Sequence, residues 1–556
     1  MKEFPVYDIL PILEKEDNFV LLESARCDQE NRRSYLFLRP RKIIWTSRPA
    51  QVGGCLTELD NALRAGCYTA GFFSYEAGAA FEERLSSKQD NDFPLLWFGV
   101  YQEPVIFDHV KGCFSKSHFP PAKRGGAGNY KKKNYALEDI KPNVSPAEYK
   151  NKISAVKRLI ARGLTYQVNY TFKLKFAFSG SPFSLYLDLR EKQSVAYSAL
   201  IKMGGVYALS FSPELFFRKN GADIIARPMK GTSARGRNIR EDARMAEELK
   251  NCPKNRSENL MIVDLLRNDL GRISAVGSVR VPCLFNVEKY PTLFQLTSDI
   301  SGSLVSAEAA FDIFRQIFPS GSVTGAPKIK TMEIISRLEK ERRGIYTGSI
   351  GFFSPRKTGV FNVAIRTVLI NKQQGKGEMG VGSGIVYDSS APAEYAECCL
   401  KANFLTNQIQ RFQLIETMLW QPEKGFLFLT EHLKRLRDSA CYFDFDFNLK
   451  QCREALKKLG KRLPCRAHKA RLLLSKKGEA DLEAVLLPPT RHKKPGIVFS
   501  REKVDSEDVF LYHKTTNRKL YDAEYRRARS RGFYDVIFSN EKGEITEGAI
   551  SNIVIK

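Results

Sequence analysis

The stretch SENLMIVDLLRNDLGR, at residues 257–272, carries the strongest structural signal in the chain. Its centre is almost wholly apolar over several helical turns, which predicts a helix buried on most of its sides. Four charged residues interrupt that apolar surface: Glu258, Asp264, Arg267 and Asp269. A charge removed from water needs a counter-ion or a ligand. The stretch is therefore both a predicted core element and a candidate part of a site.

A second predicted helix covers residues 392–401, PAEYAECCLK, and places Glu394 and Glu397 on one face. Glutamates from two helices can form a site for a hard cation. Oxygen ligands without histidine or cysteine suit Mg²⁺. The alternative is that these glutamates form ion pairs with Lys401 and Arg267.

Lys230 lies in the run IARPMKGT, at residues 225–232. The apolar, strand-like residues 222–226 direct it inward, and Gly231 allows the backbone to approach a neighbour closely. Burial lowers the pKa of a lysine and makes its amine a nucleophile or a base. The alternative is a partly buried lysine in a structural ion pair.

Two segments rich in small residues are candidate ligand-binding elements. The loop at residues 319–328, PSGSVTGAPK, leads into a predicted helix over residues 329–338 and suits an anion. Its spacing is not that of a phosphate-binding G-x-x-x-x-G-K-[ST] loop. Residues 380–384, GVGSG, could let a ligand approach the backbone. None of the six histidines falls between residues 146 and 408, so acid–base chemistry there must use other groups.

The length and composition limit the classes of protein to which the chain can belong. A chain of 556 residues is expected to form two or more domains. No apolar run approaches a membrane span and the first residues do not resemble a signal peptide, so we expect a cytoplasmic protein. The cysteines form no C-x-x-C pair, which argues against a zinc site and a disulfide framework. The net charge of +26 leaves a nucleic-acid-binding protein as an alternative of another class.

The pattern along the chain predicts an α+β protein in several parts. Residues 1–120 alternate β-like runs with turns, and the polar residues 121–145 are expected to form a loop or linker. A helix is predicted over residues 146–162, with Ser145 as its N-cap. Strands and helices then mix without regular alternation through residue 408. A second, smaller domain is expected over residues 411–556.

Five runs occur in order: ARPMKGT, ENLMIVDLLRNDLGR, FPSGSVTGAPKIKTMEII, RRGIYTGSIGFF and VGSGIVYDSSAPAEYAECCLKA. Together they resemble the chorismate-utilising enzymes, which include anthranilate synthase, aminodeoxychorismate synthase, isochorismate synthase and salicylate synthase. The resemblance implies a chorismate-binding fold with a large β-sandwich core flanked by helices.

The resemblance also implies roles for particular residues. Chorismate would be the substrate, with Mg²⁺ bridging its carboxylate to Glu258 and Glu397, and with Glu394 nearby. The residues that would contact the other end of the substrate, or lie close to it, are Tyr346, Arg366, Gly382, Ser383, Gly384, Ser322 and Lys328. In the N-terminal part, Leu22, Glu23 and Ser24 resemble a tryptophan-binding segment of family members.

Lys230 distinguishes the branches of this family. Anthranilate synthases resemble P-I-A-G-T at this point, whereas aminodeoxychorismate synthases carry P-I-K-G-T. The resemblance implies that Lys230 attacks C2 of chorismate covalently, so that ammonia adds at C4, and Glu214 is a candidate polar partner. Gln295 stands where many relatives have a histidine. We therefore expect an aminodeoxychorismate synthase, with an anthranilate synthase large subunit as the alternative. No G-x-C-x-G motif is present, which implies a separate glutamine amidotransferase subunit as the ammonia donor.

The runs FQLIETM, FLTEHLKRLRDSACYF, LYHKTTNRKLYDAE and GEITEGAISNIVI resemble fold type IV pyridoxal-phosphate enzymes, including aminodeoxychorismate lyase. The resemblance implies a partial α/β domain of this type. Lys514 would form the Schiff base, Glu547 would hold the pyridinium nitrogen, and Arg435 would bind the phosphate. The match reaches Lys556 before later elements of the family, so we expect an incomplete domain. Its reaction would be elimination of pyruvate from 4-amino-4-deoxychorismate to give 4-aminobenzoate, a step toward folate.

Overall fold

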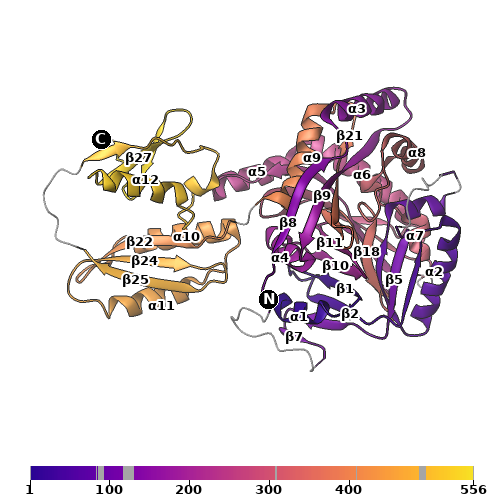
Figure 1. The fold of residues 1–556 in the computed structure, drawn as a ribbon, viewed down its shortest axis with the longest axis horizontal. Coiled ribbons are helices and arrows are strands. Elements are labelled where there is room, and N and C mark those ends of the chain that lie inside the picture. The colour runs from indigo at the N-terminus through magenta and orange to yellow at the C-terminus, as the bar shows by residue number, and fades with distance from the viewer. Residues whose placement is uncertain are drawn as a thin grey trace. The chain divides into compact units, whose positions relative to one another are not determined.

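The computed structural model (Figure 1) describes residues 2–82, 84–85, 93–116, 130–306, 310–407, 410–487 and 496–554. The chain divides into two compact units. Unit 1 contains residues 1–232, 250–290 and 295–409, and unit 2 contains residues 233–249, 291–294 and 410–556. Two short segments of the predicted chorismate-binding region thus belong to the C-terminal unit.

Unit 1 is built on two large sheets. In the described residues the first follows the order β17 (Gly325–Ala326), β9 (Gln167–Gly180), β21 (Lys376–Ile385), β20 (Thr367–Asn371), β11 (Val206–Ser212), β10 (Tyr197–Met203), β1 (Asn18–Glu23), β2 (Arg33–Leu38), β6 (Val105–Asp108), β7 (Cys113–Phe114), with β8 (Tyr135–Pro142) paired to β9. The second follows β14 (Met229–Ala234), β16 (Leu293–Ser303), β13 (Asp223–Arg227), β12 (Leu215–Asn220), β19 (Thr358–Val363), β18 (Ser349–Phe353), β4 (Tyr68–Phe73), β5 (Leu96–Tyr101), β3 (Lys42–Thr46), with β15 (Arg280–Lys289) paired to β16.

The two sheets pack face to face, as the predicted β-sandwich requires. Phe37 on β2 and Phe352 on β18 come from different sheets, and their ring centroids lie 5.7 Å apart. Both belong to one buried cluster that also contains Val20 and Phe72. Removal of these apolar faces from water is what holds the sheets together. The predicted fold class is confirmed.

Helices flank the sandwich in unit 1. They are α1 (Val6–Leu13), α2 (Pro49–Arg64), α3 (Pro146–Ala161), α4 (Pro182–Lys192), α6 (Pro253–Gly271), α7 (Asp312–Ile317), α8 (Lys328–Leu338) and α9 (Ala391–Thr406), with 3₁₀ turns η1 (Tyr75–Phe81) and η2 (Gly321–Val323). Apolar residues of α2, α6 and α7 pack in one core cluster with strands of the second sheet. The helix predicted after Ser145 is α3, and a capping box of Ser145 and Glu148 fixes its start.

Two expectations about local structure need correction. Residues 135–142, expected to lie in a loop or linker, form β8, which pairs with β9. The N-terminal part of that expected linker, residues 121–129, lies outside the described residues. Helix α6 is not buried on most sides, because Leu260 is 44% exposed and Asp264 and Arg267 lie on the same outer face.

Unit 2 contains two smaller sheets in its described residues. One has the order β23 (Gly425–Phe426), β22 (Leu414–Gln421), β24 (His468–Leu474), β25 (Ala480–Leu486), and the other has the order β26 (Ile497–Phe499), β27 (Asp535–Ser539), β28 (Ile545–Gly548). Its helices are α5 (Ile239–Asn251), α10 (Leu429–Phe443), α11 (Leu449–Gly460) and α12 (Lys519–Ser530), with the turn η3 (Val509–Leu511). Separate buried clusters form around β22 with α10 and around β27 with α12. Within the residues that the structure describes, every helix is too short or too polar to cross a membrane.

Candidate active site

Lys230 projects from β14 into the interior of unit 1. Burial lowers the pKa of its amine, and the negative charge of Glu214 opposes that shift in part. The glycine-rich strand β21 passes close to the amine, since a Cβ built on Gly384 would lie 3.3 Å from Lys230 Nζ. A lysine in this setting carries an unprotonated amine far more readily than a surface lysine does.

Glu214 is a buried acid beside this amine. It follows β11, is 4% exposed, and burial raises the pKa of its carboxyl to about 7. A hydrogen bond with Ser322 and the charge of Lys230 oppose that rise. Glu214 Oε1 is buried without a hydrogen-bond partner among the described residues. An acid with this pKa and a free oxygen is suited to pass a proton near neutral pH.

The three glutamates predicted to bind a metal come from α6 and α9. Burial raises the pKa of Glu258, the charges of Lys230 and Lys254 oppose that rise, and the smaller contributions of Glu394 and Glu397 add to it. Glu397 Oε1 lies 2.7 Å from Lys401 Nζ, and Glu394 Oε1 accepts a hydrogen bond of 2.8 Å from Ser389 Oγ. Within the described ranges, no three His, Cys, Asp or Glu side chains stand in metal-ligand geometry.

The alternative of simple ion pairs applies to only one of these glutamates. Lys401 pairs with Glu397 and also donates to the Gly382 carbonyl at 2.9 Å, which ties α9 to β21. Arg267, the other expected partner, pairs with Asp264 on the exposed face of α6. At Glu258 the charges of Lys230 and Lys254 outweigh those of Glu394 and Glu397, so lysines offset the repulsion among these carboxylates.

The residues predicted for the second carboxylate lie around β21. The Tyr346 ring packs against Gly380 so closely that a Cβ there would lie 2.1 Å from a ring carbon. Arg366 has a positive φ of 51°, and burial lowers the pKa of its guanidinium, which donates to Gln193 Oε1. Ser383 Oγ is 3.1 Å from the Tyr149 hydroxyl. Tyr149, a fully buried residue of α3, was not predicted, because its aromatic position fits an ordinary core residue.

Two predicted substrate contacts have other partners. Lys328 forms a buried ion pair with Asp269 and donates to the Ile317 carbonyl at 2.8 Å. Its amine thus holds α8 against α6, and its contact with the substrate stays a prediction. Gln295 Oε1 accepts a 3.2 Å hydrogen bond from the hydroxyl of Thr232, two residues after Lys230.

In unit 2, burial lowers the pKa of the Lys514 amine, and the positive charge of Arg435 lowers it further. Glu547 contributes negative charge near Lys514 and near Tyr521. The guanidinium of Arg435 binds the buried carboxylate of Glu416 through two hydrogen bonds of 2.8 and 2.6 Å. Lys514 and Glu547 thus lie within electrostatic reach of each other, while Arg435 already holds a carboxylate.

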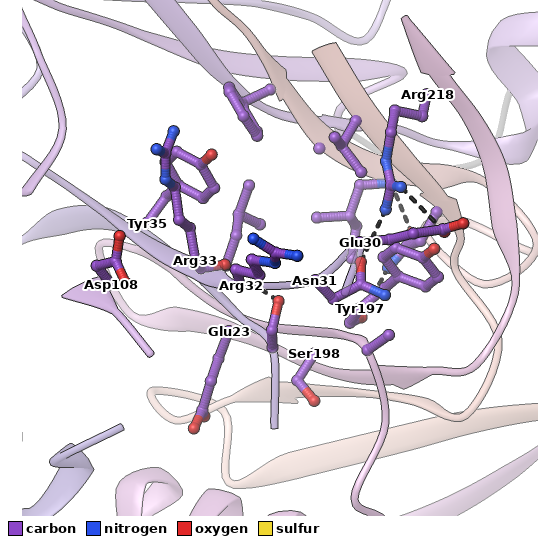
Figure 2. A pocket seen from close by; sticks show the side chains of 18 of the residues that line it. Glu23, Glu30, Asn31, Arg32, Arg33, Tyr35, Asp108, Tyr197, Ser198 and Arg218 are labelled. Carbon is purple, nitrogen blue, oxygen red and sulfur yellow. Dashed lines mark hydrogen bonds and ion pairs between the residues drawn. The ribbon is translucent and has the colours of Figure 1, made fainter. Parts of the chain in front are cut away.

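A cavity of about 480 Å³ opens in unit 1 beside the segment expected to bind tryptophan (Figure 2). Leu22, Glu23 and Ser24 belong to its lining. Charged side chains face it, including Arg218, which pairs with Glu30 at 3.1 Å. Such a mixture of charged and apolar groups suits a small zwitterion.

Comparison with known proteins identifies the families that the chain matches. Residues 17–407 match the family described as chorismate binding enzyme, and residues 413–556 match amino-transferase class IV. The chain is 36% identical over 348 residues to aminodeoxychorismate synthase component 1 of Escherichia coli strain K12, covering 61% of this chain and 76% of the relative.

Anthranilate synthases also match. Anthranilate synthase component 1 of Saccharolobus solfataricus is 34% identical over 329 residues, covering 59% of this chain and 77% of that protein. The crystal structure of anthranilate synthase component I from Streptococcus pneumoniae TIGR4 superposes with a TM-score of 0.59 at 26% identity, covering 68% of this chain and 93% of that one. With the matched family spanning both sheets of unit 1, this chain belongs to the chorismate binding enzymes and carries a class IV aminotransferase domain.

Proposed function

We propose that this enzyme aminates chorismate to 4-amino-4-deoxychorismate, with Lys230 as the covalent nucleophile. The observation that carries the proposal is a half-buried lysine whose pKa burial lowers, beside Glu214, whose carboxyl has a pKa of about 7. The similarity to aminodeoxychorismate synthase component 1 supports the same reaction. An anthranilate synthase needs no nucleophile at this position, because ammonia adds directly at C2.

The proposed steps balance in atoms and charge. The unprotonated Lys230 amine attacks C2 of the ring, the double bond shifts, and the bond from C4 to its hydroxyl breaks. Glu214 gives its proton to the departing hydroxyl, which leaves as water. Ammonia then adds at C4, the double bond shifts back, and the bond from C2 to the lysine nitrogen breaks. Lys230 leaves as the neutral amine and the added nitrogen returns its extra proton to Glu214, so that one ammonia is consumed, one water is formed and both side chains regain their starting protonation.

Mg²⁺ is the proposed metal. Glu258 and Glu397 would hold it, with Glu394 nearby, and their oxygen ligands are of the kind that Mg²⁺ prefers. The ion would bind one substrate carboxylate, and Tyr346, Arg366 and the backbone of Gly382, Ser383 and Gly384 would bind the other. The word component in the name of the Escherichia coli relative supports a partner subunit, which we propose to be a glutamine amidotransferase that supplies ammonia.

For unit 2 we propose a lyase activity that converts the product to 4-aminobenzoate and pyruvate. The class IV aminotransferase match supports pyridoxal phosphate as cofactor, which supplies an electron sink when bound. Lys514 and Glu547 fit this group, because a buried amine of lowered pKa and a carboxylate lie within electrostatic reach. Arg435 would have to exchange Glu416 for the cofactor phosphate. A role in folate biosynthesis and a cytoplasmic location remain predictions.

We further propose that the cavity beside Leu22, Glu23 and Ser24 binds tryptophan. Its volume of about 480 Å³ and its mixed charges support a zwitterionic amino acid. Titration of the full chain with tryptophan, monitored by calorimetry, should give saturable binding that Arg218→Ala weakens. Absence of heat at millimolar tryptophan would contradict this assignment.

Product analysis tests the main proposal. The full chain is incubated with chorismate, Mg²⁺ and ammonium, with and without pyridoxal phosphate, and the products are separated by chromatography. We expect 4-amino-4-deoxychorismate without the cofactor, and 4-aminobenzoate when it is added. Anthranilate as the main product would contradict the synthase assignment. Failure to form 4-aminobenzoate in the presence of pyridoxal phosphate would contradict only the lyase assignment.

A further inference from the structure

The segment that follows Lys230 is built into the C-terminal unit. Strand β14 begins at Met229 and ends at Ala234, and residues 233–249 belong to unit 2 together with residues 410–556. Residues 291–294 join the same unit, and they directly precede Gln295, the partner of Thr232. Both segments next to the proposed nucleophile thus continue into unit 2.

Arg235 makes several of the contacts that hold this segment in unit 2. Its guanidinium makes two hydrogen bonds of 2.7 and 2.6 Å with the Asp242 carboxylate and a third of 3.0 Å to the Tyr442 carbonyl. It also stacks between two aromatic rings, 4.4 Å from the centroid of Tyr442 and 5.3 Å from that of Phe294. Its side chain is 5% exposed. A planar guanidinium held in this way fixes its backbone firmly.

The next two carbonyl groups are held by side chains of the C-terminal domain. The Tyr442 hydroxyl donates to the Gly236 carbonyl at 2.7 Å in a buried bond. His513 Nε2 lies 3.1 Å from the Arg237 carbonyl, and its Nδ1 lies 2.9 Å from Ser439 Oγ. A carbonyl only accepts, so His513 must donate through Nε2 and accept from the Ser439 hydroxyl.

These contacts define a clamp, made of Tyr442, His513 and Ser439, on the backbone that follows Lys230. His513 directly precedes Lys514, the proposed cofactor lysine. The hydrogen bond from His513 to the Arg237 carbonyl, together with the Arg237–Glu507 ion pair, joins the segment that carries Lys514 to the residues that follow β14, all within unit 2.

We infer that the C-terminal unit is part of the amination machinery: its clamp positions β14, and through it Lys230, for attack on the substrate. This inference rests on the proposed role of Lys230. Tyr442 and His513 act on the backbone and not on the substrate, so they are positioning residues. Loosening the clamp should slow the covalent step without weakening substrate binding.

Tyr442→Phe in the full chain tests the clamp. The substitution keeps the ring against Arg235 and removes only the bond to the Gly236 carbonyl. Loss of one such bond should lower kcat for amination about twofold to tenfold and leave KM for chorismate unchanged. Amide hydrogen exchange over residues 231–237 should rise by a similar factor. Tyr512→Phe is the matched control, since it keeps the ring beside the Arg237 guanidinium and removes a hydroxyl that donates to the Ser506 carbonyl at 3.1 Å and to neither of the two clamped carbonyls.

Measurement of both kcat and amide hydrogen exchange distinguishes a failure of the clamp from a failure of the proposed function. Equal kcat and equal exchange in Tyr442→Phe, Tyr512→Phe and the unaltered chain would overturn the inference. Faster exchange in Tyr442→Phe alone, with normal kcat, would show a clamp that does not serve amination and would also overturn it. If the product proved to be anthranilate, the proposed function would fail, while the exchange data would still report whether the clamp holds β14.

Discussion

Replacement of Arg343 should be among the most damaging single changes in unit 1. Its guanidinium binds the Glu339 carboxylate through bonds of 2.9 and 2.7 Å, and it also donates to the carbonyls of Val323 at 2.8 Å and Asn169 at 2.6 Å. Both side chains are almost fully buried, at 2% and 6% exposed. Arg343→Met leaves the Glu339 charge without its partner inside the protein, which costs about 3–5 kcal/mol. Because Val323 follows Ser322, the loop beside Glu214 should loosen as well.

The lost stability comes from the buried charge of Glu339, so removal of that charge should recover much of it. Adding Glu339→Gln to Arg343→Met should restore more than half of the lost stability, since the amide oxygen can still accept from the Thr171 N–H. Urea unfolding in a Trp420→Phe background leaves Trp45 and Trp97, both in unit 1, as fluorescent reporters. A loss below about 1 kcal/mol for Arg343→Met, or a double variant no more stable than the single one, would refute the account.

Two further changes probe the substrate site. Tyr149→Phe removes the hydroxyl bound to Ser383 Oγ, so KM for chorismate should rise about twofold to tenfold with little change in kcat. An unchanged KM would count against a role for Ser383 in binding. Amination requires Glu214 in its protonated form, so kcat should fall as pH rises through about 7. Glu214→Gln should be slower at every pH and should no longer show this fall in kcat, which a pH profile from 6 to 9 records. Persistence of the same fall in Glu214→Gln would assign it to another group.

Local signals were sufficient to predict much of the fold. Ser145 and the apolar spacing behind it predicted α3, and the capping box is present. Strand β4 lies among the β-like runs expected in residues 1–120, and the helix expected at residues 392–401 lies within α9. These features depend on neighbours within a few residues, which a sequence displays directly.

Other features depend on contacts that are distant in sequence. Strand β8 is a polar strand with no buried residue, so its sequence shows no alternation and only its pairing with β9 makes it a strand. Lys328 could be placed near a substrate by resemblance, but its partner Asp269 is 59 residues away and could not be recognised from spacing. Residues 233–249 continue the predicted synthase region in sequence, although they pack in unit 2.

The central proposal is that Lys230 is a covalent nucleophile, and the rate of C4 amination in Lys230→Ala tests this role most directly. The full chain and the variant are compared at saturating chorismate, Mg²⁺ and ammonium, with circular dichroism to show that the variant is folded. The account predicts that formation of 4-amino-4-deoxychorismate falls more than about a hundredfold, because the route from C2 to C4 is lost. Amination at C4 at the full rate in Lys230→Ala would contradict it.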